Sequence, residues 1–147
     1  MLKDLWESYY LEENYNCAES LLRAANDYYA LGLRENEMKL VGGYGRGVQT
    51  EGVCGAYLSA VGVLSMRYID EKAHESGYIR PAVNLFTLRL KERLGTLQCS
   101  ELMPRNTRPG MRCGLTVETV CEVLEETIEE FDGGMGAAGL KDGQGKA

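Results

Sequence analysis

The chain has 147 residues, a length typical of one domain that buries about 70% of its unfolded surface and needs neither disulfides nor metal to fold. It carries 22 acidic and 16 basic side chains, a net charge of -6, and has no block of lysine and arginine, so we expect no nucleic-acid partner. The opening stretch MLKDLWESYYLEEN is charged and lacks a continuous apolar core. We therefore expect neither a signal peptide nor a membrane partner, and we place the protein in the cytoplasm.

The first half of the chain has hydrophobic residues at helical spacing, which predicts an all-α fold. Asn16 and Glu19 form a variant of the capping box at the start of one helix, and Gly32 is suited to end it. Four helices are predicted in this half, at about residues 2–13, 16–32, 33–43 and 53–68.

The second half of the chain continues the helical pattern. Pro81 suits the first turn of a fifth helix that ends at Gly95, and Thr116 is the predicted cap of a last helix. The predicted elements are helices at 81–94 and 116–131, with a loop between them that contains one helical turn at 100–103. We therefore expect a single-domain bundle of about five to six helices over residues 1–131, with a glycine-rich loop before the fourth helix. The segment 132–147 has little apolar surface and is predicted to be a disordered tail.

Five cysteines, at positions 17, 54, 99, 113 and 121, contain no C-x-x-C pair, so any shared site must be assembled by the fold. An odd number of cysteines in a reducing compartment indicates redox-active, metal-binding or buried thiols rather than a disulfide framework. Cys54 falls in the first turn of the predicted fourth helix, Cys17 directly follows its cap, and Cys99 precedes the predicted turn. The unpaired N–H groups at a helix start favour a thiolate at these positions.

The helix dipole alone does not ionise these thiols. Its contribution of about 0.3–1 kcal/mol lowers a thiol pKa by less than one unit, since one unit corresponds to ~1.36 kcal/mol. A thiolate that predominates at neutral pH therefore needs a second contributor. Arg46 is the candidate for Cys54, because the loop could fold its guanidinium over the start of the helix.

The glycine-rich run at 42–47 alternates glycine with other residues and matches neither G-x-G-x-x-G nor a P-loop, so no nucleotide site is predicted. Its glycines either form a tight turn or allow close approach to a ligand or cluster. Gly55, Ser59 and Gly62 then give one helix face little bulk, so that another backbone or a planar group could approach it. The candidate cofactor-binding residues are Gly43, Gly45, Arg46, Gly47 and Gly55.

Cys99 and Cys113 are the expected closest pair of cysteines. A bond between them would close the 15-residue loop 99–113, for which chain entropy gives ~3 kcal/mol, and could form and break without dismantling the bundle. Cys121 lies on the apolar stripe of the last helix and is interpreted as a buried hydrophobe.

The ordered motifs NCAES at 16–20, GGYGRG at 42–47, CGAYLSAVG at 54–62 and LGTLQCSELM at 94–103, followed by an isolated Cys113, resemble the family of putative redox-active proteins named for its pattern, C_GCAxxG_C_C. Ser59 stands where that family usually has glycine. The resemblance implies a small, mostly helical, cytosolic prokaryotic protein. It also implies that Cys17, Cys54, Cys99 and Cys113 form a redox or cluster-binding set, with Cys121 outside it.

Three functional hypotheses follow. In the first, the four motif cysteines converge in one pocket and undergo dithiol/disulfide exchange or electron transfer with a redox partner protein or a small thiol or disulfide. In the second, the same four residues, Cys17, Cys54, Cys99 and Cys113, bind an iron-sulfur cluster or zinc. In the third, the protein is a helical small-ligand-binding module or homodimer with buried cysteines. The sequence leaves the cofactor, the substrate and the electron donor open.

Overall fold

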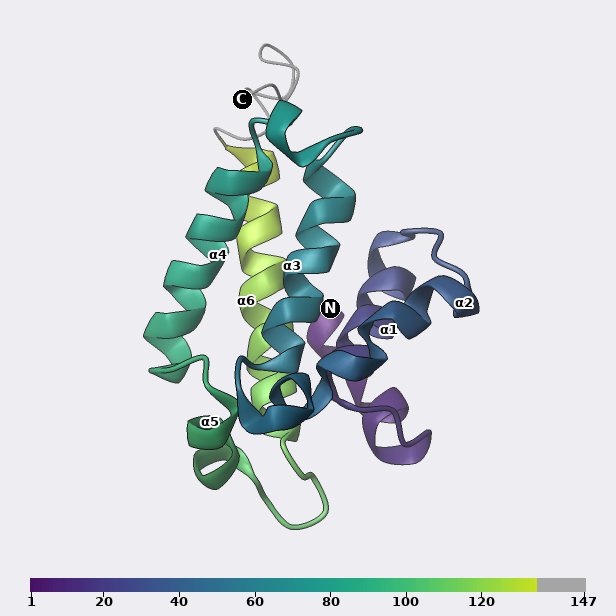
Figure 1. The fold of residues 1–147 in the computed structure, drawn as a ribbon, viewed down its shortest axis with the longest axis vertical. Coiled ribbons are helices and arrows are strands. Elements are labelled where there is room, and N and C mark those ends of the chain that lie inside the picture. Colours follow the sequence, from purple (N-terminus) through teal and green to yellow (C-terminus); the bar gives the residue numbers. More distant parts are fainter. Residues whose placement is uncertain (135–147) are drawn as a thin grey trace.

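A computed structural model describes residues 1–134 as a helical bundle (Figure 1). Short 3-10 segments lie at Leu2–Asp4, Lys39–Tyr44 and Ala73–Glu75, and wide helical turns at Ser8–Glu12 and Gly47–Glu51. The α-helices of this part of the chain are α1 (Cys17–Tyr29), α2 (Glu35–Met38), α3 (Gly55–Tyr68), α4 (Ile79–Leu94), α5 (Cys99–Asn106) and α6 (Gly114–Gly133). The all-α class is confirmed: residues 1–134 contain no strand, and the six α-helices reach the upper end of the predicted number.

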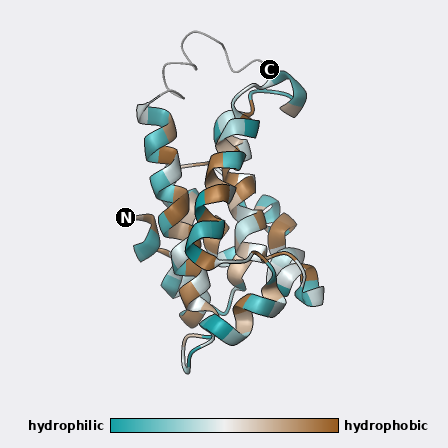
Figure 2. Ribbon diagram, turned by 90° about the vertical axis from the view of Figure 1, so that its left-hand side faces the viewer, coloured by the Kyte–Doolittle hydropathy of each residue, from teal (hydrophilic) through white to brown (hydrophobic). Residues whose placement is uncertain are grey.

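The long helices α3, α4 and α6 run side by side, and α1 packs against α3 on the other side from α4 (Figure 1). The apolar faces of the helices turn towards one another, as the hydropathy colouring shows (Figure 2). The largest fully buried side chains include Trp6, Leu21, Leu64, Phe86 and Leu124, so every long helix contributes to one core. Within residues 1–134 we find no helix with the length and apolar character that a bilayer span requires.

The start of α1 is fixed by the predicted capping box. The Asn16 side chain accepts a hydrogen bond from the Glu19 N–H at 3.0 Å, and the Glu19 carboxylate accepts one from the Asn16 N–H at 3.0 Å. The Asn16 amide also donates to the Gly42 carbonyl at 2.9 Å. One side chain therefore both starts α1 and holds the glycine-rich loop against it.

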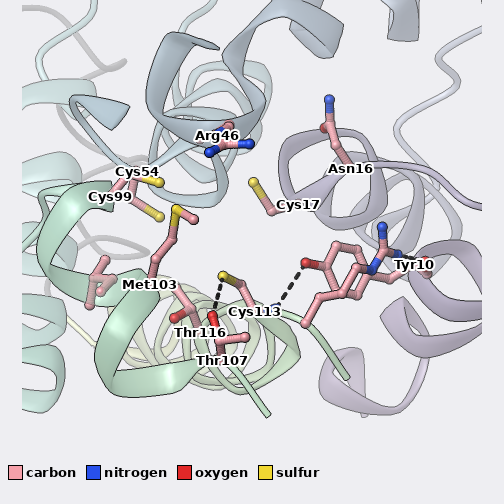
Figure 3. A pocket seen from close by; sticks show the side chains of 13 residues that line it. Tyr10, Asn16, Cys17, Arg46, Cys54, Cys99, Met103, Thr107, Cys113 and Thr116 are labelled. Carbon is pink, nitrogen blue, oxygen red and sulfur yellow. Dashed lines mark hydrogen bonds between the residues drawn. The ribbon is translucent and has the colours of Figure 1, made fainter. Parts of the chain in front are cut away.

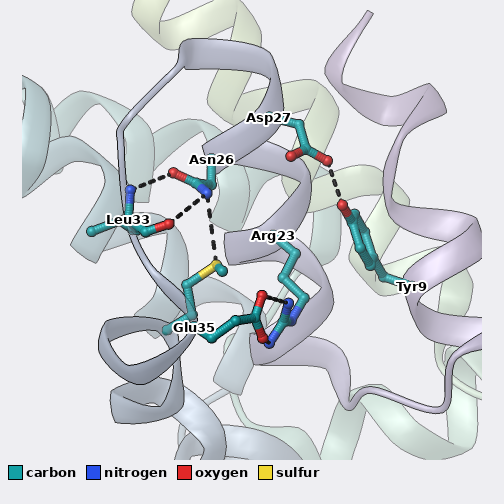
Figure 4. Close-up of polar contacts among 7 residues, drawn as sticks. Tyr9, Arg23, Asn26, Asp27, Leu33 and Glu35 are labelled. Carbon is teal, nitrogen blue, oxygen red and sulfur yellow. Dashed lines mark hydrogen bonds and ion pairs between the residues drawn. The ribbon is translucent and has the colours of Figure 1, made fainter.

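The turn between α1 and α2 is held by side chains of α1 (Figure 4). The Asn26 amide accepts from the Leu33 N–H at 2.9 Å and donates to the Leu33 carbonyl at 3.1 Å. Arg23 makes two hydrogen bonds to the Glu35 carboxylate, at 2.7 and 2.9 Å. These contacts keep α2 close to α1, so that the segment after α2 returns towards the start of α1.

Several helix boundaries differ from the prediction. Cys54 is the N-cap of α3 rather than a residue of its first turn, and α6 begins with Cys113 as its N-cap, before the predicted cap Thr116. The Thr116 hydroxyl instead accepts from the Asn106 amide at 2.9 Å. The helix α5 spans eight residues rather than one turn. Because α6 continues to Gly133, it includes the first residues of the predicted tail, and residues 135–147 lie outside the described part of the chain.

The small residues of α3 have different neighbours. A Cβ at Gly55 would lie 2.2 Å from the Tyr44 carbonyl oxygen, so this position admits only glycine. Buried Ser59 donates to the Ala18 carbonyl at 2.8 Å across the contact with α1. A Cβ at Gly62 would have no neighbour within 4 Å. Of the three small residues predicted to form one face of this helix, Gly55 and Ser59 contact the backbone of a neighbouring segment, and Gly62 does not.

Gly55→Ala and Gly62→Ala form a matched pair with opposite expected effects. The first should lower the free energy of unfolding by about 1–3 kcal/mol, because the added methyl group overlaps the Tyr44 carbonyl. The second should raise it by ~0.5–1 kcal/mol, because alanine is the better helix former and the site is open. Urea unfolding of both variants measures the difference, and effects of the same sign would contradict the packing described for Gly55.

Candidate functional site

The four motif cysteines line one cavity of about 380 Å³ at the end of the bundle near α5 (Figure 3). Each comes from a different helix: Cys17 is the first residue of α1, Cys54 the N-cap of α3, Cys99 the first residue of α5, and Cys113 the N-cap of α6. Four helix N-termini, each with unpaired N–H groups and partial positive charge, therefore meet at the same cavity. The helix start at Cys113 is not apparent from the sequence, because turn-forming residues directly precede it.

A short backbone bridge places Cys54 beside Cys99. Val53 pairs with Gln98 in an isolated antiparallel bridge, in which the Cys54 N–H donates to the Leu97 carbonyl at 2.8 Å and the Cys99 N–H to the Gly52 carbonyl at 2.6 Å. Since side chains alternate across such a bridge, both cysteines project to the same side of it. Figure 3 shows their side chains next to each other. All five cysteines are free thiols in the structure, and the Cys99–Cys113 bond stays a prediction.

The glycines of the loop allow it to pack closely against three helix starts. A Cβ at Gly45 would lie 2.4 Å from the Asn16 side chain, and one at Gly47 would lie 2.6 Å from the Cys99 Cβ. Gly47 also has a left-handed φ of +60°, which favours glycine. Gly43 has no such neighbour. Of the five predicted cofactor-binding residues, Arg46 and Gly55 line the cavity, whereas Gly43, Gly45 and Gly47 are not among its lining residues.

The turn after the glycines is left-handed over most of its length. Arg46, Val48, Gln49 and Glu51 all have φ between 52° and 63°, an arrangement that is costly for a β-branched residue such as Val48. The turn is closed by hydrogen bonds from the Gln49 side chain to Gly45 and from the Gly52 N–H to Gly47, both at 2.9 Å. Its backbone accepts the Cys99 N–H through Gly52, so the turn supports the start of α5, and Arg46 is its residue that lines the cavity.

Arg46 does not take the position expected from the sequence. Its guanidinium pairs with Glu51 at 2.9 Å and is 62% exposed, so it does not cover the start of α3. Its backbone N–H instead hydrogen-bonds to the Cys17 thiol and acts to lower the pKa of that group. The positive charge of Arg46 also acts to lower the pKa of Cys99.

Burial, rather than the helix dipole, dominates the acidity of the buried site thiols. Burial raises the pKa of Cys54 from 9.0 to about 12, against the opposing hydrogen bonds from the backbone of Tyr57 and Ala56. Burial also raises the pKa of the Cys17 and Cys99 thiols. The low thiol pKa expected for the helix-start cysteine Cys54 is therefore wrong, because the cost of desolvating a thiolate exceeds the gain from nearby N–H groups. These three thiols are protonated at neutral pH.

Cys113 has polar neighbours that the sequence did not indicate. Its N–H donates to the Tyr10 hydroxyl at 3.1 Å, and its sulfur lies 3.5 Å from the Thr107 hydroxyl (Figure 3). The Arg112 guanidinium stacks over the Tyr10 ring, 4.1 Å from its centre, and donates to the Tyr10 carbonyl. Nothing in the sequence distinguishes Tyr10 from the other tyrosines, because its contact with Cys113 joins segments that lie far apart in the chain.

The residues that line the cavity include Arg46 and Arg112 but no aspartate or glutamate. Among residues 1–134, no group of three or more Cys, His, Asp or Glu side chains is arranged to hold a metal ion. Zinc or a cluster bound to the four motif cysteines would therefore require their sulfurs to move towards one another. Cys121 lies fully buried in the core, outside the cavity, as expected for a buried hydrophobe.

The structure is that of a small all-α protein in which four cysteines surround one cavity. The sequence matches the family described as putative redox-active protein (C_GCAxxG_C_C) over residues 15–127, and the chain belongs to this family. No curated protein and no solved structure shows significant similarity to it. The family match includes all four cysteines that line the cavity.

The raised pKa of Cys54 predicts a pH dependence of stability. The unfolded thiol loses its proton near pH 9, whereas the folded one keeps it to about pH 12, so its contribution to stability is complete below about pH 9 and is lost as the pH rises towards 12. Cys54→Ala should therefore show a shallower decrease in the free energy of unfolding above about pH 9 than the wild type. Urea unfolding between neutral and alkaline pH tests this, with Gly62→Ala as a control that removes no titrating group. Parallel curves for wild type and Cys54→Ala would contradict the raised pKa.

Proposed function

We propose that this protein is a cytoplasmic thiol redox protein whose four motif cysteines, Cys17, Cys54, Cys99 and Cys113, carry out dithiol/disulfide exchange. The observation that supports the proposal best is that these four residues line one cavity although they come from four separate helices. Packing alone does not require four thiols at one end of a bundle. The membership of a redox-active family adds to this argument.

The proposed reaction transfers two electrons for each pair of thiols. Two protein thiols lose two protons and two electrons and form one S–S bond, while the S–S bond of an external disulfide breaks and yields two thiols. The external disulfide is a small disulfide or a cystine of a redox partner protein. A cavity of about 380 Å³ lies within the range of small-molecule sites, so the end of a small disulfide fits at the thiols.

The high pKa of the buried thiols has a chemical consequence. Because a protonated thiol is a poor nucleophile, the reduced protein resists non-specific oxidation until one of its thiols is ionised. Once a first mixed disulfide forms, the neighbouring thiols lie in the same cavity and need no second collision. The arrangement therefore favours formation of protein disulfides over release of a half-oxidised protein.

Thiol titration in denaturant tests the proposed function, with Cys121→Ala as the background because that residue lies outside the cavity. Fully reduced Cys121→Ala has four thiols, since five free cysteines are present in the wild type and one is removed. After treatment with oxidised glutathione and removal of the excess, we expect two or none. Four remaining thiols under every disulfide oxidant tried would overturn the proposal.

Metal binding by the same residues is the second candidate, because the cavity brings four thiols together. Purification without oxygen, followed by metal analysis and an absorption spectrum, tests it. Stoichiometric iron or zinc that is lost in Cys54→Ser but retained in Cys121→Ala would favour the cluster or zinc site over thiol exchange. Absence of stoichiometric metal from the anaerobic protein would remove this candidate.

A further inference from the structure

We propose that the four cysteines act as two unequal pairs, in which Cys113 attacks the incoming disulfide and Cys17 resolves the mixed disulfide. This inference rests on the proposed thiol exchange and assigns roles within it. Cys54 and Cys99 form the second, interior pair.

Accessibility separates the pairs. Cys54 and Cys99 are buried, whereas Cys17 and Cys113 are partly exposed. Cys54 and Cys99 are also joined by the backbone bridge between Val53 and Gln98, which holds them on one side of the cavity. An incoming disulfide therefore meets Cys17 or Cys113 before it reaches the interior pair.

The surroundings of Tyr10 join Cys17 to Cys113. Tyr10 is 5% exposed, and its hydroxyl oxygen accepts the Cys113 N–H, which leaves the hydroxyl proton available for another acceptor. Tyr10, Cys17 and Cys113 all line the same cavity. In Figure 3 these two sulfurs lie on the Tyr10 side of the cavity and the sulfurs of Cys54 and Cys99 on the far side.

Cys113 has the polar neighbours that suit the attacking sulfur. The Thr107 hydroxyl lies 3.5 Å from its sulfur and can donate to it once it is ionised. Cys113 caps α6, a helix of 20 residues, and Arg112 is the preceding residue. The titratable or charged groups that line the cavity with the pair are Tyr10 of the N-terminal segment, Arg46 of the glycine-rich loop, Cys54 of α3, Cys99 of α5 and Arg112 of the preceding loop. Glu51 pairs with Arg46 and acts on Cys99.

The steps balance as follows. The Cys113 thiolate attacks one sulfur of an external disulfide R–S–S–R, forms Cys113–S–S–R and releases one thiolate R–S⁻. Cys17 then transfers its proton to solvent, attacks the Cys113 sulfur and releases the second R–S⁻, which leaves a Cys17–Cys113 disulfide. The protein has then lost two electrons and the external disulfide has gained them. Thr107 donates a hydrogen bond to the Cys113 sulfur anion and is not consumed.

The experiment uses the reduced full chain in the Cys121→Ala background with oxidised glutathione as the probe. Brief exposure, acid quenching and peptide mass spectrometry locate the first mixed disulfide. We expect it on Cys113, and we expect it to accumulate in Cys17→Ser but not in Cys54→Ser. A first mixed disulfide on Cys17 or Cys99 would overturn the assigned roles, and so would accumulation of the mixed disulfide in Cys54→Ser. Neither result would change the number of thiols lost, so the proposed function would still stand.

Thr107→Val gives a second readout that does not depend on replacing a cysteine. It removes the hydroxyl that lies 3.5 Å from the Cys113 sulfur, so alkylation of Cys113 by iodoacetamide at neutral pH should slow about three- to tenfold. Tyr9→Phe, whose hydroxyl contacts Asp27 at the surface, is the control and should keep the wild-type rate. An unchanged rate in Thr107→Val would show that this hydroxyl is only structural and overturn its assigned role.

Discussion

The close packing of the glycine-rich loop against three helix starts is the constraint on which the site depends. Gly55 meets the Tyr44 carbonyl, Gly45 meets Asn16, and Gly47 meets Cys99, each at a distance that leaves no room for a Cβ. If the loop moved outward by the width of a methyl group, the starts of α1, α3 and α5 would no longer face one cavity. The glycines therefore bring the cysteines together by allowing the chain to pack closely.

Two opposing electrostatic effects act on the sulfurs that this packing brings together. Helix N-termini favour negative charge, and desolvation disfavours it. For the interior thiols desolvation is the larger effect, which explains the high pKa of Cys54. At the partly exposed edge of the cavity, hydroxyl groups stand beside Cys113. One cavity therefore holds thiols with different polar neighbours without any change in residue type.

Local sequence signals predicted much of the fold. Asn16 with Glu19 and the glycine after α4 identified the ends of two helices, because caps depend on neighbouring residues. The start of α6 was missed because turn residues directly before Cys113 concealed it. The family resemblance singled out the four cysteines that line the cavity, but their neighbours Tyr10 and Thr107 depend on contacts between distant segments that no local pattern encodes.

The charge of the cavity lining differs from that of the whole chain. The chain carries a net charge of -6, whereas the residues lining the cavity include two arginines and no carboxylate. At long range the protein attracts cations and repels anions, and salt weakens both effects beyond about 10 Å. In the proposed exchange, a partner protein with a basic surface around an anionic disulfide segment would complement both the acidic chain and the arginines of the cavity, of which Arg46 is paired with Glu51. Free anionic disulfides would first meet repulsion, so their rate of encounter should increase with ionic strength, whereas that of a basic partner should decrease.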